Sequence, residues 1–187
     1  MFKSPKLIAE IGCNHKGDFE IAKELLKIAA DCGAYVAKFQ KRNNKELLTQ
    51  DQYNSPHPNP INAYGDTYGE HREFLEFDIS QHQELKKYAE TLGLIYSSSV
   101  WDITSAKEIV SLEPELIKVP SACNNHFDML KVLRDEYAGE VHISFGMTTQ
   151  EEEDKIVTYF EKTKQAQRLI LYSCTSGYPV PFEDVCM

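Results

Sequence analysis

The strongest constraint on the fold is a regular alternation of short β-prone runs with amphipathic segments of helical period. Residues 6–11 form a β-prone run, and residues 19–32 follow with Ile21, Leu25 and Ile28 at helical spacing. Further strands are predicted at 34–40, 94–98, 116–119, 141–145 and 169–173, and further helices at 80–92 with Ser80 as N-cap, 103–112, 124–136 and from 151 after the N-cap Thr149. Short strands that alternate with helices pair in parallel through right-handed crossovers.

Two architectures fit this alternation: a doubly wound open sheet, or most of a (β/α)8 TIM barrel. No G-x-G-x-x-G motif follows the first strand, which argues against the dinucleotide-binding form of the open sheet. We therefore predict an α/β fold of the barrel type. A barrel needs eight strands and about 250 residues. Because the chain has 187 residues, we expect a single incomplete barrel domain over 1–187 with about six βα units.

Residues 41–79 interrupt the alternation of strands and helices between the second strand and its helix, since a βα loop usually spans about 2 to 6 residues. This insertion contains Pro56, Pro58 and Pro60. On a barrel it would lie at the catalytic face as a lid or an interface arm, with a short helix over 70–77. A flexible insertion without a chemical role is the alternative.

Charge and hydropathy limit the partners and the location of the chain. Its net charge of −9 argues against nucleic acid or an anionic membrane as the main partner. No stretch approaches the roughly 18 apolar residues of a membrane span, so we expect a cytoplasmic protein. The five cysteines are odd in number and widely spread, which favours buried, reduced thiols over a disulfide framework or a zinc site.

Charged residues stand near the carboxyl ends of three predicted strands, where the open mouth of a barrel can solvate them. By the two-residue period of strands, Lys38 and Gln40 share one face of their strand. Glu10 and Lys118 are placed in the same way on their own strands. Two lysines that converge on one mouth make a small anion site. Alternatively, they snorkel or pair with Glu10 in a buried network.

Hydroxyl groups follow successive strands at the same level and would add neutral donors to an anion site. These residues are Ser98, Ser99, Ser121, Ser144, Ser173, Thr175 and Ser176. Serines are common in turns, so their joint placement is more informative than any one of them. The pattern predicts a ligand that carries phosphate or carboxylate groups.

Two other readings of the polar residues stay open. A barrel lysine such as Lys118 can form a Schiff base with a carbonyl substrate, as in a class I aldolase. The six histidines show no H-E-x-x-H or comparable spacing, which argues against a metal site made by this chain alone. His15, in the loop after the first strand, either holds the turn or contacts the substrate.

Several motifs resemble, in order and spacing, those of the sialic acid synthase family, the N-acetylneuraminate synthases and their relatives. They are AEIGCNHKG at 9–17, AKFQ at 37–40, KVPS at 118–121, SFGM at 144–147 and CTSGYP at 174–179. The stretch YGDTYGEHR at 64–72 is similar to an insertion of some members. The match spans nearly the whole chain.

The resemblance implies a (β/α)8 barrel followed by a small antifreeze-like domain, a homodimer, and condensation of phosphoenolpyruvate with N-acetylmannosamine, its 6-phosphate or a related amino sugar. It also implies a divalent metal, Mn²⁺ or Mg²⁺, with ligands in motifs beyond residue 187, so that this chain carries no metal ligand. The family pattern assigns phosphoenolpyruvate binding to Lys38, Ser99, Lys118, Ser121 and Ser144, and sugar binding to Glu10, Gln40 and Tyr178. Ser176, a further substrate-binding candidate, stands where many relatives have asparagine.

The implied chemistry gives the candidate catalytic residues distinct roles. Lys38 and Lys118 neutralise the anionic reactant without reacting, while the metal activates the aldehyde of the open-chain sugar. Glu10 either holds a sugar hydroxyl or stabilises the cationic centre that develops on the enol carbon. Pro120 and Trp101 depart from the usual family pattern near the phosphate side.

We therefore expect the N-terminal part of a synthase of this family, with the phosphoenolpyruvate half of the site and no turnover by the isolated chain. The first and sixth strands would be unpaired edges. The alternatives are a lysine Schiff-base aldolase and a non-catalytic barrel fragment used for binding or assembly.

Overall fold

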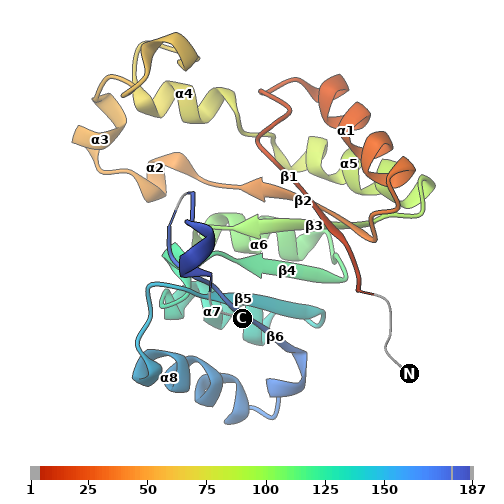
Figure 1. Cartoon of the computed structure of the whole chain (residues 1–187), viewed down its shortest axis with the longest axis vertical. Helices are drawn as coiled ribbons and strands as arrows, with labels where there is room; N and C mark the ends of the chain where they lie inside the picture. Colours follow the sequence, from red (N-terminus) through yellow and green to blue (C-terminus); the bar gives the residue numbers. More distant parts are fainter. Residues whose placement is uncertain (1–4, 178, 186–187) are drawn as a thin grey trace.

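A computed structural model of the chain describes residues 5–177 and 179–185. Six parallel strands form one sheet in the order β1-β2-β3-β4-β5-β6 (Figure 1). Their bounds are β1 Ile8–Gly12, β2 Val36–Lys41, β3 Ile95–Val100, β4 Leu116–Val119, β5 Glu140–Phe145 and β6 Leu169–Ser173. The helices between them are α1 Phe19–Asp31, α5 Ile79–Thr91, α6 Ile103–Ser111, α7 Phe127–Asp135 and α8 Gln150–Glu161.

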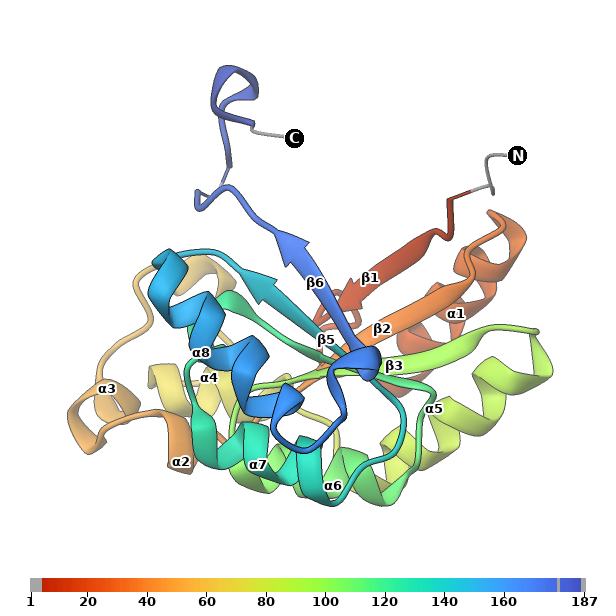
Figure 2. The ribbon, with the colours of Figure 1, turned by 90° about the horizontal axis from the view of Figure 1, so that it is seen from below.

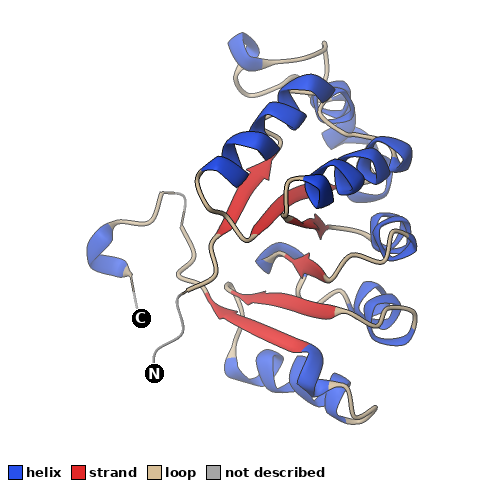
Figure 3. Ribbon diagram, turned by 90° about the vertical axis from the view of Figure 1, so that its right-hand side faces the viewer, coloured by secondary structure: helices blue, strands red, loops and turns tan. Residues whose placement is uncertain are grey.

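The sheet is curved but not closed, which confirms the prediction of an incomplete (β/α)8 barrel. Figure 2 shows β1 and β6 at the two edges of a trough, with the helices beneath it. Within the described chain, β1 pairs only with β2, and β6 pairs only with β5. Figure 3 shows helices along one face of the sheet, while the described residues form no helix layer on the concave face.

The apolar core lies between the sheet and these helices. Alternate residues of each strand point to the helix side, and Phe39, Ile117 and Ile143 are fully buried there. They pack in two clusters against the inward faces of the helices. Burying a side chain of this kind contributes about 1.5–3 kcal/mol. The remaining alternate residues, which include the candidate site residues, face the concave side.

Two predicted helix starts are wrong. Helix α5 begins at Ile79 with Asp78 as N-cap, because the Asp78 carboxylate accepts the Gln81 backbone N–H at 2.8 Å, while the Ser80 hydroxyl donates to Asp78 at 2.6 Å. The predicted helix 124–136 begins only at Phe127. Residues 124–126 precede the helix, and the Asn124 side chain donates to the Ser144 carbonyl at 2.9 Å. Thr149 caps α8 as predicted.

The insertion is helical and is tied to the body of the fold. It contains α2 Asn44–Leu47, α3 Gln50–Asn54, the 3-10 turn η1 Pro60–Asn62 and α4 Tyr68–Phe74, where a helix over 70–77 was expected. The Asn43 backbone N–H donates to the Asp102 carboxylate at 2.7 Å, and the Glu46 carboxylate accepts the Ile103 N–H at 3.0 Å. These contacts fix the start of the insertion against the loop after β3, at the carboxyl edge of the sheet (Figure 1).

Three further short 3-10 turns complete the described structure: η2 Ser121–Cys123, η3 Ala166–Arg168 and η4 Phe182–Asp184. Cys13, Cys32, Cys123 and Cys174 carry free thiols. Cys13 and Cys123 are only partly buried, and the expectation of buried thiols is wrong for Cys32 and Cys174, which are exposed. Cys186 lies outside the described residues. Across the described residues, no helix has the length and apolarity needed to span a bilayer.

Candidate active site

Strand register brings the candidate residues together on the concave face. Glu10 of β1 lies opposite Lys38 of β2, and Gln40 lies opposite Ser99 of β3. Ser99 in turn lies opposite Lys118 of β4. Because parallel strands end at the same edge, these side chains surround one cavity of about 620 Å³. The cavity is lined by Ile8, Glu10, Gly12, Cys13, Asn14, Lys38, Gln40, Ser99, Trp101, Lys118, Pro120, Ser121, Ser144, Tyr172 and Cys174.

Lys38 and Glu10 form an ion pair at one side of this cavity. The Lys38 ammonium contacts a carboxylate oxygen of Glu10. The Lys38 side chain is only 7% exposed, whereas that of Glu10 is 65% exposed. The pair therefore leaves the carboxylate open to solvent and to a ligand, while the ammonium stays in the wall.

Lys118 is a buried cation whose described hydrogen-bond partners are neutral. Its Nζ donates to Ser144 Oγ at 2.5 Å and to the Val119 carbonyl at 2.8 Å. Burial, followed by the charge of Lys38, lowers the pKa of Lys118 to about 8. A cation held in this way binds an anion without first breaking an ion pair of its own.

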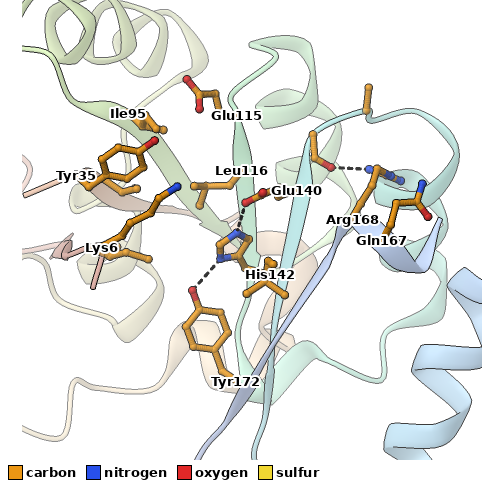
Figure 4. A pocket seen from close by; sticks show the side chains of 15 residues that line it. Lys6, Tyr35, Ile95, Glu115, Leu116, Glu140, His142, Gln167, Arg168 and Tyr172 are labelled. Carbon is orange, nitrogen blue, oxygen red and sulfur yellow. Dashed lines mark hydrogen bonds and ion pairs between the residues drawn. The ribbon is translucent and has the colours of Figure 1, made fainter. Parts of the chain in front are cut away.

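A second cavity of about 590 Å³ lies on the same face, toward the amino ends of the strands, and shares Ile8 and Tyr172 with the first. Figure 4 shows His142 in this lower cavity between Glu140 and Tyr172. His142 Nδ1 lies 2.7 Å from the Tyr172 hydroxyl, and His142 Nε2 lies 3.1 Å from Glu140 Oε2. The Tyr172 ring also faces the Lys118 ammonium, 5.2 Å from the ring centroid. These contacts hold the Tyr172 ring next to the Lys118 ammonium.

The serines differ in their placement. Ser99, Ser121 and Ser144 line the first cavity, which contains Lys38 and Lys118 and is called the upper cavity from here on. Ser176 is exposed outside the residues that line it, and its hydroxyl accepts the Met147 backbone N–H at 3.0 Å. A Cβ at Gly146 would lie 2.8 Å from Ser121 Oγ and 3.2 Å from Ser176 Oγ. Glycine at this position therefore lets both hydroxyls come close to the backbone. Tyr178 lies outside the described residues.

His15 holds the turn after β1, which is one of its two predicted roles. It is 2% exposed, its ring stacks on Phe77 with centroids 4.1 Å apart, and its Nδ1 accepts the Gly17 N–H at 3.1 Å. Burial lowers the pKa of His15 to about 4. His15 is therefore a neutral packing residue behind the loop.

The sequence did not single out Arg42, His142 or Tyr172, and it marked Trp101 only as a departure from the family pattern. Period-two alternation from Ser144 points to His142, so this signal was present. The position of Arg42 depends on the fold of the insertion, because its guanidinium contacts Glu76, 34 residues further on.

Comparison with known proteins identifies the relatives of this arrangement. The model of the NeuB family matches residues 25–187. The chain belongs to the NeuB family. The human N-acetylneuraminate-9-phosphate synthase is 35% identical over 185 residues, a match that covers 96% of this chain and 49% of the human protein. The N,N'-diacetyllegionaminic acid synthase of Campylobacter jejuni is 29% identical over 98% of this chain and 55% of its own length.

The solved structures agree with the NeuB family assignment at the level of the fold. The N-acetylneuraminic acid (sialic acid) synthetase of Leptospira borgpetersenii, in complex with citrate, superposes with a TM-score of 0.80 at 24% identity. This match covers 97% of the chain and 58% of the Leptospira chain. The chain spans about half the length of the curated NeuB relatives it matches.

The metal expected for the NeuB family was tested against the donor groups of this chain. Residues 5–177 and 179–185 contain no group of three or more His, Cys, Asp or Glu side chains that could hold a metal ion. The described residues thus do not fit a metal centre of their own.

Proposed function

We propose that this chain carries the phosphoenolpyruvate-binding part of a nonulosonic acid synthase, an enzyme that condenses phosphoenolpyruvate with an N-acetylated amino sugar. Membership of the NeuB family supports the reaction class, since the named relatives are synthases of sialic and legionaminic acids. The observation that carries the substrate assignment is Lys118, a buried ammonium with neutral described partners in a cavity that also holds Lys38.

Phosphoenolpyruvate matches the polar groups of the upper cavity. It carries a phosphate and a carboxylate, and two ammonium groups with a ring of hydroxyls supply charged and neutral donors to both. Ser99, Ser121 and Ser144 are the hydroxyls in place. Phosphate oxygens would accept the hydrogen bonds that Lys118 Nζ now donates to Ser144 Oγ and to the Val119 carbonyl.

The proposed reaction forms one carbon–carbon bond and releases phosphate. The C3 carbon of phosphoenolpyruvate attacks the aldehyde carbon of the open-chain sugar, whose oxygen takes up a proton. Water adds to C2 and loses one proton, which balances the proton taken up by the aldehyde oxygen. The C2–O bond to phosphate then breaks, and the C2 hydroxyl passes its proton to the departing phosphate to give the keto acid. The two lysines hold the anion in place throughout, and do not become covalently attached.

We propose that Glu10 acts on the developing charge at C2. Its carboxylate reaches into the cavity from the edge strand β1 while it stays paired with Lys38. A positive centre at C2 would be stabilised by this carboxylate, which is fixed before the reaction and needs no reorganisation. We assign Glu10 this electrostatic role, with sugar binding on the side of Gln40.

Calorimetric titration of the 187-residue chain with phosphoenolpyruvate tests the proposal. We expect binding to wild type and at least a tenfold weaker affinity for Lys118→Met, because a charge-assisted hydrogen bond contributes about 1.5–3 kcal/mol. Lys131→Met is the matched control, since Lys131 is an exposed cation paired with Asp135. Equal affinities for the three proteins, or no binding to folded wild type, would contradict the proposal.

The aldolase alternative has a separate test. Borohydride reduction in the presence of pyruvate traps a Schiff base on a reactive lysine. We expect no added mass on any peptide that contains Lys38 or Lys118. Covalent labelling of either lysine would replace the proposed function with class I aldolase chemistry.

A further inference from the structure

Arg42 is a largely buried cation just behind the wall of the upper cavity. It follows β2, and its backbone N–H donates to Glu76 Oε2 at 2.9 Å. Its guanidinium lies 3.4 Å from Glu76 Oε1 and 4.2 Å from the centroid of the Trp101 ring. The side chains of Arg42 and Glu76 are each only 10% exposed. Ionic contact on one side and the indole face on another therefore hold the guanidinium in one orientation.

The next contact of this guanidinium reaches a residue of the cavity wall. Arg42 Nη2 donates to Gln40 Oε1. A guanidinium has donors only, so the side-chain oxygen of Gln40 must face Arg42, and its NH2 group must face the other way. That nitrogen lies beside Gly12, 3.3 Å from where a Cβ on Gly12 would stand, and both Gln40 and Gly12 line the cavity.

We propose that Arg42 is a positioning residue, which fixes the amide of Gln40 so that its NH2 group is offered to the ligand as a hydrogen-bond donor. Gln40 then selects a sugar with an acceptor oxygen at this point, such as a hydroxyl or the carbonyl of an N-acyl group. This inference rests on the proposed function for the identity of the ligand. The orientation of the Gln40 amide is argued from its contact with Arg42, and is tested without any ligand.

The insertion acquires a chemical role through this contact. Glu76 ends the insertion and Arg42 begins it, so the ion pair between them closes the inserted segment on itself. Asp102 fixes the adjoining residue Asn43 through its backbone N–H at 2.7 Å. The folded insertion thus fixes the guanidinium of Arg42, and Arg42 in turn orients the side chain of Gln40 in the cavity wall.

The first experiment measures the orientation of the amide by NMR on the ¹⁵N-labelled chain. In wild type we expect nuclear Overhauser contacts between the Gln40 side-chain NH2 protons and the Gly12 Hα protons. Arg42→Met removes the donors but keeps the length of the side chain, and should weaken these contacts. Lys45→Met is the matched control from the same insertion, because Lys45 is exposed and lies 3.7 Å from Glu73. Absence of the contacts in wild type, which needs no variant to fold, would overturn the inference.

The second experiment titrates the same proteins with N-acetylmannosamine and, separately, with phosphoenolpyruvate. For Arg42→Met we expect sugar affinity to fall about three- to tenfold, the equivalent of one neutral hydrogen bond, with phosphoenolpyruvate affinity within twofold of wild type. Arg42→Lys should restore sugar affinity in part, since it keeps the charge. Gln40→Glu should lose it, because both carboxylate oxygens are acceptors.

The outcomes separate the two proposals. If wild type binds phosphoenolpyruvate and Arg42→Met binds the sugar as wild type does, the positioning role is wrong and the proposed function stands. If folded wild type binds neither compound, the proposed function fails, and the nuclear Overhauser contacts alone decide the role of Arg42.

Discussion

Anion binding to the upper cavity should weaken as the pH rises through the pKa of Lys118. Burial and the charge of Lys38 lower this pKa to about 8. The protonated fraction is then about 0.9 at pH 7 and about 0.1 at pH 9, so the apparent affinity for phosphoenolpyruvate should fall about tenfold, or ~1.4 kcal/mol. The ligand contributes little to this change, because its phosphate, with a second pKa of about 6, is already ionised at pH 7.

Calorimetry at pH 7, 8 and 9 measures this dependence, with Lys118→Arg as the matched variant. Arginine stays protonated over the whole range, so its affinity should be nearly constant between pH 7 and 9. Cys174→Ser is titrated in parallel, because the Cys174 thiol lines the same cavity. An affinity of wild type that does not change up to pH 9, or an equal decline in Lys118→Arg, would refute the assignment to Lys118.

Three further predictions concern stability and the shape of the site. Burial lowers the pKa of His82 to about 3 and that of His15 to about 4, so the unfolded chain binds protons more readily at both residues, and each should lower the stability by about 2 kcal/mol between pH 8 and pH 5 in urea unfolding. Phe39→Ala should destabilise the fold by about 3–5 kcal/mol in the same assay, since Phe39 is fully buried in the core, whereas Ile61→Ala, at a residue 94% exposed, should change stability by less than about 0.5 kcal/mol. Gly146→Ala places a Cβ 2.8 Å from Ser121 Oγ and should weaken phosphoenolpyruvate binding at least threefold, or ~0.7 kcal/mol.

Each of these predictions has a contradicting result. His82→Gln should reduce the loss of stability at pH 5, and an unchanged loss would assign it to other groups. Equal effects of Phe39→Ala and Ile61→Ala would contradict the placement of the core on the helix side. Wild-type affinity of Gly146→Ala would show that the Ser121 hydroxyl has room to move.

The sequence predicts the strands better than the contacts between them. The strands 116–119 and 169–173 are found within their predicted bounds, because each is a short apolar run with a break on either side. The start of α5 was misplaced because Asp78 and Ser80 are both good N-caps, and only the geometry decides which carboxylate or hydroxyl reaches the Gln81 N–H.

In the site, too, local patterns could be predicted from the sequence, whereas contacts between distant segments could not. Lys38 and Lys118 follow from strand alternation, which is local and needs no knowledge of the partner strand. The contact of Arg42 with Gln40 could not be predicted in this way, since the guanidinium is held by Glu76 from the far end of the insertion. The hydrogen bond between His142 of β5 and Tyr172 of β6 joins two residues that are 30 apart in sequence, and it depends on the register of the two strands.

The separation between the two faces of the sheet has a consequence for how such a chain can change over time. Packing energy is concentrated where Phe39, Ile117 and Ile143 meet the helices, while the cavity that we propose as the binding site lies on the concave face. A substitution at Gln40 or Ser99 would alter what is recognised at little cost to the core. Under the proposed function, new specificities can therefore arise on this scaffold through replacements in the cavity wall, with the folded framework inherited intact.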